Sequence, residues 1–214
     1  MKFTDACVFP YPDGNTSVRR MALEARSLGF DSIVAVDTPG GEYAGVSVLP
    51  GILIRDVPVR EVIGRVKRER SRGSVISVQA GDAGFNRAVI GIKGMHILRG
   101  IQYCDKKAFD HVSAKMAADN RVAIDIDLSP VISGRGIARQ RVLHRYRDIL
   151  VLQNRFEFPV TISSFARSCL DMRAVRELSG LCSLLGMDVD AVGSALGSVD
   201  AILTPPASAV EVIG

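Results

Sequence analysis

Two short apolar runs with polar ends, and the segment between them, decide the fold. The first run is Val122-Ala123-Ile124-Asp125-Ile126-Asp127-Leu128-Ser129-Pro130, and the second is Val160-Thr161-Ile162-Ser163-Ser164. Each predicts a strand whose apolar residues are continuous rather than alternating, as in a parallel strand that is covered on both faces. The intervening segment places four apolar residues on one helical face, namely Ala138, Val142, Tyr146 and Ile149. The stretch therefore predicts a strand–helix–strand unit.

Similar units extend outward from this stretch in both directions. Strands are predicted at eight apolar runs: Phe3–Phe9, Ser32–Val36, Gly51–Ile54, Val75–Val78, Met95–Leu98, Val122–Ile126, Val160–Ile162 and Ala201–Leu203. A helix predicted over Arg19–Leu28 ends before Gly29, which suits a helix C-terminus. The alternation predicts an α/β fold, which is either an open doubly wound sheet or a closed barrel whose functional loops follow the strands.

Length and composition favour one folded domain over residues 1–214. The chain has 214 residues, 47% of them hydrophobic, and it contains no segment long enough to be a convincing linker. No apolar run approaches the roughly 18–20 residues that cross a bilayer, and Asp5 interrupts the start of any secretory signal. We therefore expect a cytoplasmic protein without a membrane partner. The four cysteines are scattered without a C-x-x-C pair, so reduced and mostly buried thiols are expected.

Two basic clusters are more informative than the net charge of +4. Between Pro58 and Gly73, only two acidic residues oppose the six basic residues Arg60, Arg65, Lys67, Arg68, Arg70 and Arg72. The second cluster follows the Ile124–Asp127 run and consists of Arg135, Arg139, Arg141, His144, Arg145 and Arg147. Closely spaced cations suit the phosphates of a nucleic acid, although the first cluster also suits a solvated helix face. In the second cluster Arg145 projects beside the apolar face, so some of these arginines are expected to pair internally, and Arg135 and Arg139 are the favoured contacts.

The residues that could support independent catalysis form no recognised pattern. The three histidines are isolated, and Ser163-Ser164 lacks a G-x-S-x-G context, so a turn or capping role is favoured for these serines. Four aspartates at strand ends could converge on a magnesium ion, namely Asp5, Asp37, Asp125 and Asp127. For Asp125 and Asp127 we favour capping of backbone groups or pairing with arginine. We therefore predict no catalytic residue and no metal ligand.

The order and spacing of several segments resemble the thirty-kilodalton protein subunit family of ribonuclease P, called protein component 3 in archaea. The resemblance runs through Val122–Pro130, the arginine-rich helix, Val160–Ser164, Asp171–Leu178, Leu185–Met187 and Ala195–Leu203. It is thinner before residue 122, where Phe3-x-Asp5 and Gly51–Arg55 are similar to the family's first strands. This resemblance implies a TIM-like (β/α) barrel related to the polymerase and histidinol phosphatase (PHP) superfamily. Asp5-Ala6-Cys7 stands where that superfamily carries metal-binding histidines in an H-x-H pattern, which argues against metal catalysis by the chain.

The function implied by the resemblance is to assist a catalytic RNA that removes the 5′ leader from precursor tRNA. The implied partners are ribonuclease P RNA, a small ferredoxin-like protein subunit, the other ribonuclease P proteins and precursor tRNA as substrate. The chain alone would not be catalytic and would bind no cofactor, whereas the RNA-catalysed reaction would use magnesium. The alternatives are a divergent magnesium-dependent phosphoesterase of the PHP superfamily and a barrel enzyme of sugar or phosphate metabolism.

The predicted RNA contacts are basic residues near the C-terminal ends of strands: Arg55, Arg87, Arg99, Arg135 and Arg139. A second contact is predicted on the helix around Arg65 and Arg68. Few aromatic residues accompany these arginines, so we expect contacts mostly to phosphates and to RNA shape.

Overall fold

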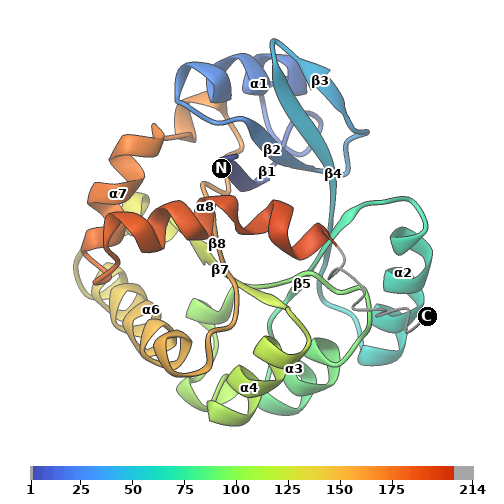
Figure 1. Ribbon diagram of the computed structural model, residues 1–214, viewed down its shortest axis with the longest axis vertical. Helices are drawn as coiled ribbons and strands as arrows, with labels where there is room; N and C mark the ends of the chain where they lie inside the picture. The colour runs from blue at the N-terminus through green and yellow to red at the C-terminus, as the bar shows by residue number, and fades with distance from the viewer. Residues whose placement is uncertain (1, 205–214) are drawn as a thin grey trace, which may run out of the picture.

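Parallel strands form a nearly closed barrel inside a ring of helices in the computed structural model, which describes residues 2–204 (Figure 1). Around the barrel the parallel strands follow in the order β1 (Thr4–Val8), β2 (Ser32–Val36), β4 (Val46–Ile54), β5 (Val75–Gln79), β6 (Ile97–Arg99), β7 (Ala123–Asp127) and β8 (Val160–Ser163). A parallel bridge between Val8 and Ala166 brings the last strand next to the first. The barrel alternative is therefore confirmed over the open sheet.

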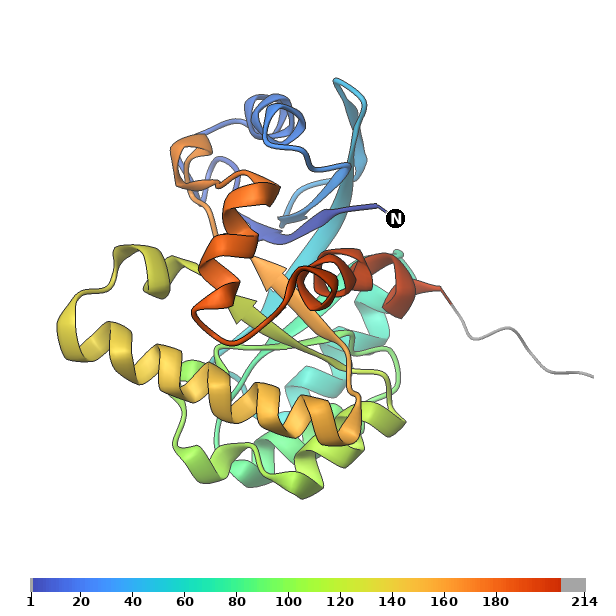
Figure 2. The ribbon, with the colours of Figure 1, turned by 60° about the vertical axis from the view of Figure 1, so that its left-hand side comes forward.

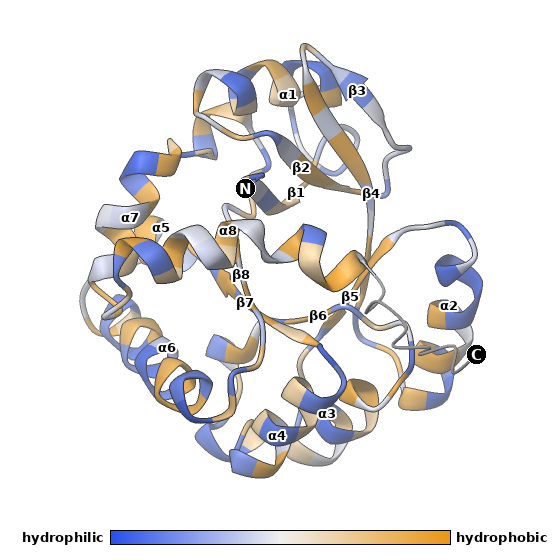
Figure 3. Ribbon diagram, viewed as in Figure 1, coloured by the Kyte–Doolittle hydropathy of each residue, from blue (hydrophilic) through white to orange (hydrophobic). Residues whose placement is uncertain are grey.

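Helices follow most of the strands, as the sequence predicts, although the short strand β3 (Gly41–Tyr43), rather than a helix, lies between β2 and β4. They are α1 (Val18–Ser27), α2 (Val59–Arg70), α3 (Ala83–Ile90), α4 (His111–Asp119), α5 (Ser129–Ser133), α6 (Gly136–Phe156), α7 (Val175–Ser183) and α8 (Val189–Leu203). The helix α1 begins where Ser17 accepts a hydrogen bond from the backbone N–H of Arg20, and it ends before Gly29, which has a φ of +91°. Figure 3 shows apolar strands inside the barrel and helices that carry both apolar and polar residues. Among residues 2–204, no helix combines the length and the apolarity needed to cross a membrane.

The helix α8 lies across the N-terminal end of the barrel (Figure 1). Its Val199 belongs to an apolar cluster with residues near the N-terminal ends of the strands, including Val75, Ile97 and Ala123. The Ser198 hydroxyl donates to the carbonyl of Val160, the first residue of β8, at 2.6 Å. This helix therefore covers the N-terminal end of the barrel. The C-terminal ends of the strands lie at the opposite end, which α8 does not cover.

The prediction of an eighth strand at Ala201–Leu203 is wrong, because these residues form the last turn of α8. Ile202 and Leu203 continue the helical spacing of the buried side chains Val192, Leu196 and Val199, and this helical face packs on the barrel, whereas Ala201 is exposed. The default prediction of core packing for Val192, Ala195 and Leu196 is confirmed. The single-domain prediction covers residues 1–214, of which residue 1 and residues 205–214 lie outside the described part.

The strand predicted at Gly51–Ile54 begins earlier, at Val46, and a short antiparallel strand β3 (Gly41–Tyr43) pairs with its first half. Buried Val46 and Val48 anchor this first half, although Pro50 and Gly51 interrupt the apolar pattern. Gly51 allows close strand packing, because a Cβ there would lie 2.7 Å from Cγ1 of Val34. The longer strand ends at Ile54 and delivers Arg55 to the rim of the barrel.

Candidate nucleic-acid interface

The barrel interior contains a buried ion pair between the ends of β6 and β7. Arg99, which is 1% exposed, donates from Nη1 to Oδ2 of Asp125 at 2.6 Å, and its Nη2 donates to the carbonyl of Ala6. Asp125 also accepts hydrogen bonds from the hydroxyls of Thr161 and Ser163, each at 2.7 Å. Both oxygens of this carboxylate are therefore engaged by one cation and two hydroxyls.

Two further carboxyl groups lie close to this pair. Oδ1 of Asp5 accepts from the backbone N–H groups of Cys7 at 3.2 Å and Ser164 at 3.0 Å, whereas its Oδ2 is buried and has no hydrogen-bond partner among the described residues. Burial raises the pKa of Asp5 to about 6. Asp127 accepts from the backbone N–H of Ser129 at 2.8 Å, and burial raises its pKa to about 7. These carboxyls hold protons at a pH where an exposed aspartate is ionised.

This interior fits a structural role better than a metal site. Within residues 2–204, no three His, Cys, Asp or Glu side chains come together in a way that could hold a metal ion. Asp125 pairs with arginine and Asp127 caps a backbone N–H, so the favoured expectation for both is confirmed. The guanidinium of Arg99 compensates the charge of the buried Asp125 carboxylate, as a metal ion would in a metal site.

The thiols and the serines near β8 also have structural surroundings. The four cysteines are free thiols, as expected; Cys7 and Cys182 are buried, and burial raises the pKa of each to about 12. The Ser164 hydroxyl accepts from the backbone N–H of Ala166, which confirms its turn role, whereas Ser163 is a buried donor to Asp125. These groups stabilise the barrel interior and the turn after β8.

The structure corrects the prediction of Arg99 as an RNA contact. Its side chain is inside the barrel and is held by Asp125 and by the carbonyl of Ala6, so it presents no charge to a ligand at the surface. Some arginines of the second cluster were expected to pair internally, and Arg145 does so: it is buried and donates to the carbonyls of Ile101 and Asp105, each at 3.4 Å. Sequence position at a strand end therefore does not establish that an arginine points outward.

Three other predicted contacts remain accessible but are paired with carboxylates. Arg87 on α3 donates to Asp110 at 2.6 Å. On α2, Arg65 pairs with Glu61 at 2.5 Å and Arg68 pairs with Glu69 at 2.9 Å. The side chains of Arg65 and Arg68 are 39% and 63% exposed, so part of each guanidinium still faces solvent. These pairs partly cancel the charge that a phosphate would meet.

The remaining predicted contacts, Arg55, Arg135 and Arg139, follow the C-terminal ends of β4 and β7. Arg55 is exposed, and Arg135 donates to the carbonyls of Ile132 at 3.2 Å and Gly134 at 3.1 Å. Arg139 on the first turn of α6 donates to the carbonyl of Ile132 at 3.1 Å. Over the described ranges, no carboxylate lies within 4.0 Å of these three guanidinium groups. They form no ion pair at this distance and bring positive charge to the end of the barrel opposite α8, where Arg55 also interacts electrostatically with Asp37.

Sequence reasoning missed Arg167 and Arg173, which lie in the segment after β8. Arg167 donates to the carbonyl of Asp13 at 2.7 Å, and its guanidinium lies 4.7 Å from the ring centroid of Phe9. Arg173 donates to the carbonyls of Leu170 at 2.9 Å and Met172 at 2.7 Å. Their position after a strand was an available signal, because the same argument selected Arg55.

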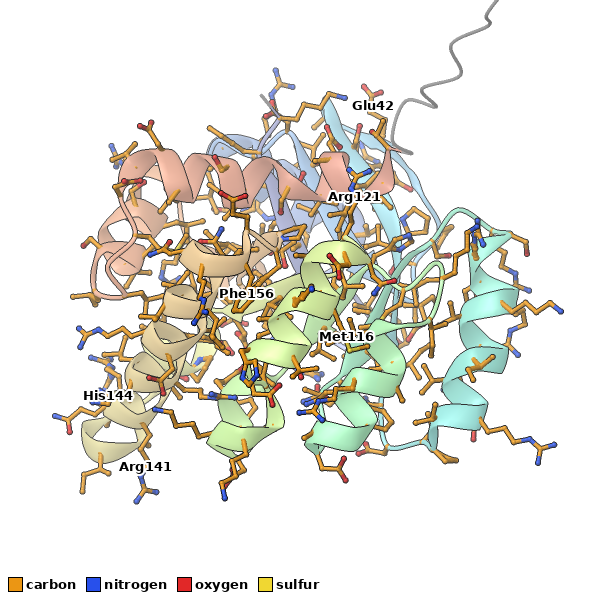
Figure 4. All side chains as sticks on the ribbon, turned by 60° about the horizontal axis from the view of Figure 1, so that its bottom comes forward. Glu42, Met116, Arg121, Arg141, His144 and Phe156 are labelled. Atoms are coloured by element: carbon orange, nitrogen blue, oxygen red, sulfur yellow. The ribbon has the colours of Figure 1, made fainter. Side chains whose placement is uncertain are left out.

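Figure 4 places Arg141 and His144 on α6 toward the end of the barrel opposite α8, whereas Arg121 lies beside α8. Arg121 donates from Nη2 to the carbonyl of Ala201 at 2.6 Å. The start of α6 therefore contributes basic groups to the same end of the molecule as Arg135, and Arg121 belongs to the opposite end.

The chain matches the family described as RNase P subunit p30 over residues 2–206. It is 30% identical over 208 residues to ribonuclease P protein component 3 of Methanosarcina mazei, covering 92% of this chain and 87% of the relative. Identity to the protein of the same name from Haloarcula marismortui is 31% over 200 residues, covering 88% of this chain and 84% of the relative.

A solved structure of archaeal ribonuclease P with mature tRNA, determined by cryo-EM, contains a chain with the same fold. The TM-score is 0.76 at 20% sequence identity, and the superposition covers 92% of this chain and 89% of that chain. This structural similarity supports the assignment of the fold as a TIM-like barrel.

Proposed function

Because the chain belongs to the RNase P subunit p30 family, we propose that it assists the RNA of ribonuclease P in removing the 5′ leader from precursor tRNA. The family consists of subunits of a tRNA-processing enzyme. The observation that carries the proposal is the family match over residues 2–206, which spans the whole barrel rather than one motif. The divergent phosphoesterase has no comparable support.

The chain contributes binding surface and shape, and the RNA contributes the chemistry. The most polar part of the barrel interior supports this division, because Asp125 is engaged by Arg99, Thr161 and Ser163. Both oxygens of this carboxylate already accept hydrogen bonds from side chains of the barrel, and the group is fully buried, which suits a structural role. The chain itself would bind no cofactor, and the magnesium ions of the reaction would associate with the RNA.

The RNA contacts would be made mainly by Arg55, Arg135 and Arg139. These guanidinium groups lie at the end of the barrel opposite α8 and form no ion pair within 4.0 Å with a described carboxylate. Each phosphate that they neutralise would release condensed counterions, so binding would weaken steeply as salt rises. Arg65 and Arg68 would supply a second contact, weaker because each already pairs with a glutamate. Arg87 would likewise be a weaker contact, because it already pairs with Asp110 at 2.6 Å.

The protein partners would be a small ferredoxin-like subunit and the other ribonuclease P proteins, together with precursor tRNA as the substrate of the complex. The complex would act in the cytoplasm.

Binding of the full chain to its cognate ribonuclease P RNA, measured over a range of salt concentrations, tests this function. Three phosphate contacts predict a slope of about −2 to −3 for the logarithm of affinity against the logarithm of salt. Affinity that does not respond to salt would contradict the phosphate contacts. Magnesium-dependent cleavage of RNA by the protein alone would favour the phosphoesterase instead.

A further inference from the structure

A groove of about 510 Å³ runs between the α5–α6 junction and α7. We call it the α5–α7 groove; the residues that matter for its binding properties are Ile132, Leu181 and Leu184 on the apolar side and Arg139, Arg173 and Glu177 on the charged side. Figure 2 shows α7 standing beside α6, with α5 at the outer end of this region. Leu184 is 48% exposed, so an apolar surface is open to a ligand here.

Four guanidinium groups surround the α5–α7 groove. Arg139 and Arg173 line it, Arg135 precedes α6, and Arg147 donates to the carbonyl of Leu184 at 2.8 Å. All four are held by main-chain carbonyls, and none has a carboxylate within 4.0 Å in the described part of the chain. A carbonyl fixes the orientation of a guanidinium without cancelling its charge. The groove is therefore rimmed by oriented and uncompensated cations.

One of these groups has an unused donor. Nε of Arg139 is buried and has no hydrogen-bond partner among the described residues, although its Nη2 bonds to Ile132. Leaving a buried donor unpaired costs free energy, so the Arg139 side chain would gain from turning its Nε toward an acceptor oxygen of a ligand in the groove. The single acidic residue of the lining, Glu177, accepts from the backbone N–H of Ala174 at 3.1 Å and is used to begin α7. The groove consequently favours an anionic ligand.

We propose that the α5–α7 groove binds one unstacked nucleotide of single-stranded RNA. The inference rests on the proposed function and specifies a site for it. The phosphate would accept hydrogen bonds from Arg139 and Arg173, which present planar donors suited to phosphate oxygens. The base would make apolar contact with the side chains of Leu181 and Leu184 rather than stack on a ring, because the described residues that line the groove include no aromatic side chain.

The charge balance favours RNA over an acidic protein segment. A protein segment would need several carboxylates at the spacing of four arginines, whereas an RNA strand carries one phosphate per nucleotide along its whole length. Apolar surface beside these cations also suits unstacked bases, which are the usual targets of single-strand recognition.

The affinity of variants for the cognate ribonuclease P RNA should distinguish binding in the α5–α7 groove from non-specific attraction by positive charge elsewhere on the surface. We expect Arg139→Gln and Arg173→Gln each to weaken binding about tenfold and to reduce the salt slope by about one. Arg26→Gln is the matched control, because Arg26 is also held by a carbonyl, that of Ala44, but lies on α1. It should change affinity less than about twofold.

A second variant tests the base contact without changing charge. Leu184→Ser should weaken binding and leave the salt slope unchanged, because it removes apolar contact and no cation. RNA carrying a photoreactive uridine should cross-link to residues 131–184 of the wild-type chain. Circular dichroism of each variant would confirm that the barrel is folded.

If the Arg139, Arg173 and Arg26 variants bind RNA with equal affinity, the groove proposal is wrong. The proposed function would still stand in that case, provided that the wild-type chain binds the RNA. Loss of wild-type binding itself would instead refute the function. If the groove variants keep full RNA affinity but fail to assemble with a ribonuclease P protein, the groove is a protein-docking site and the nucleotide proposal is wrong.

Discussion

Nη1 of Arg99 lies 2.6 Å from Oδ2 of Asp125, and both side chains are removed from solvent at the centre of the barrel. The pair joins β6 to β7, and Asp125 extends the connection to β8 through Thr161 and Ser163. An ion pair in this environment depends on both partners, because removing one leaves an uncompensated buried charge.

Replacement of the buried cation should therefore destabilise the barrel strongly. We expect Arg99→Met to lower the free energy of unfolding by about 3–5 kcal/mol, measured by urea denaturation. Arg65→Met, which breaks an exposed pair with Glu61, should cost less than about 1 kcal/mol.

A double variant that combines Arg99→Met with Asp125→Asn tests whether the lost stability comes from an uncompensated charge. The amide introduced by Asp125→Asn is not charged, but its carbonyl oxygen can still accept from Thr161. The double variant should therefore be more stable than Arg99→Met alone. A double variant less stable than Arg99→Met would show that the pair matters through packing rather than charge.

The protonation of Asp5 should make stability depend on pH. Its pKa is raised from 3.8 to about 6 by burial, so at pH 5 the folded state holds a proton that the unfolded state has released. The stability from this proton is fully present below about pH 4 and is lost as pH rises through about 6. Asp127, with a pKa raised to about 7, acts in the same direction.

The variant Asp5→Asn isolates this effect, because an asparagine oxygen can still accept from Ser164 and Cys7 but cannot titrate. Its stability relative to the wild type should increase by on the order of 2–3 kcal/mol between about pH 4 and about pH 7.5. Parallel pH profiles of the two proteins, measured by urea denaturation, would rule out a titrating Asp5 in this range.

The packing of α8 across the barrel end can be tested within one helix. Val199 is fully buried in the apolar cluster at the N-terminal end of the strands, whereas Val189 on the first turn is 72% exposed. We expect Val199→Ala to cost about 1–2.5 kcal/mol in thermal denaturation and Val189→Ala to cost less than about 0.5 kcal/mol. Similar losses from both would contradict the sealing role of α8.

The strand pattern was predictable where continuous apolar runs form strands buried on both faces. Seven of the eight predicted strands correspond to β1, β2, β4, β5, β6, β7 and β8. Ala201–Leu203 was mistaken for a strand because three apolar residues fit either a strand or the end of a buried helix. The longer spacing of Val192, Leu196 and Val199 was the signal that distinguishes them.

The candidate site was only partly predictable, because sequence gives the position of an arginine but not its partner. Arg99 and Arg135 both follow strands, yet one is buried against Asp125 and the other is exposed and held by carbonyls. The α5–α7 groove depends on segments more than 40 residues apart, Ile132 on α5 and Leu181 on α7, which only the folded barrel brings together. The family resemblance predicted the function, whereas geometry was needed to separate available arginines from paired ones.

Cleavage of precursor tRNA tests the central claim most directly. The assay would use the cognate ribonuclease P RNA at limiting magnesium, with and without this chain and the small ferredoxin-like subunit proposed as its partner, and with the protein alone as the control. We predict that the chain stimulates removal of the 5′ leader only when the RNA is present. Magnesium-dependent cleavage by the protein alone, with no stimulation of the RNA, would contradict the account.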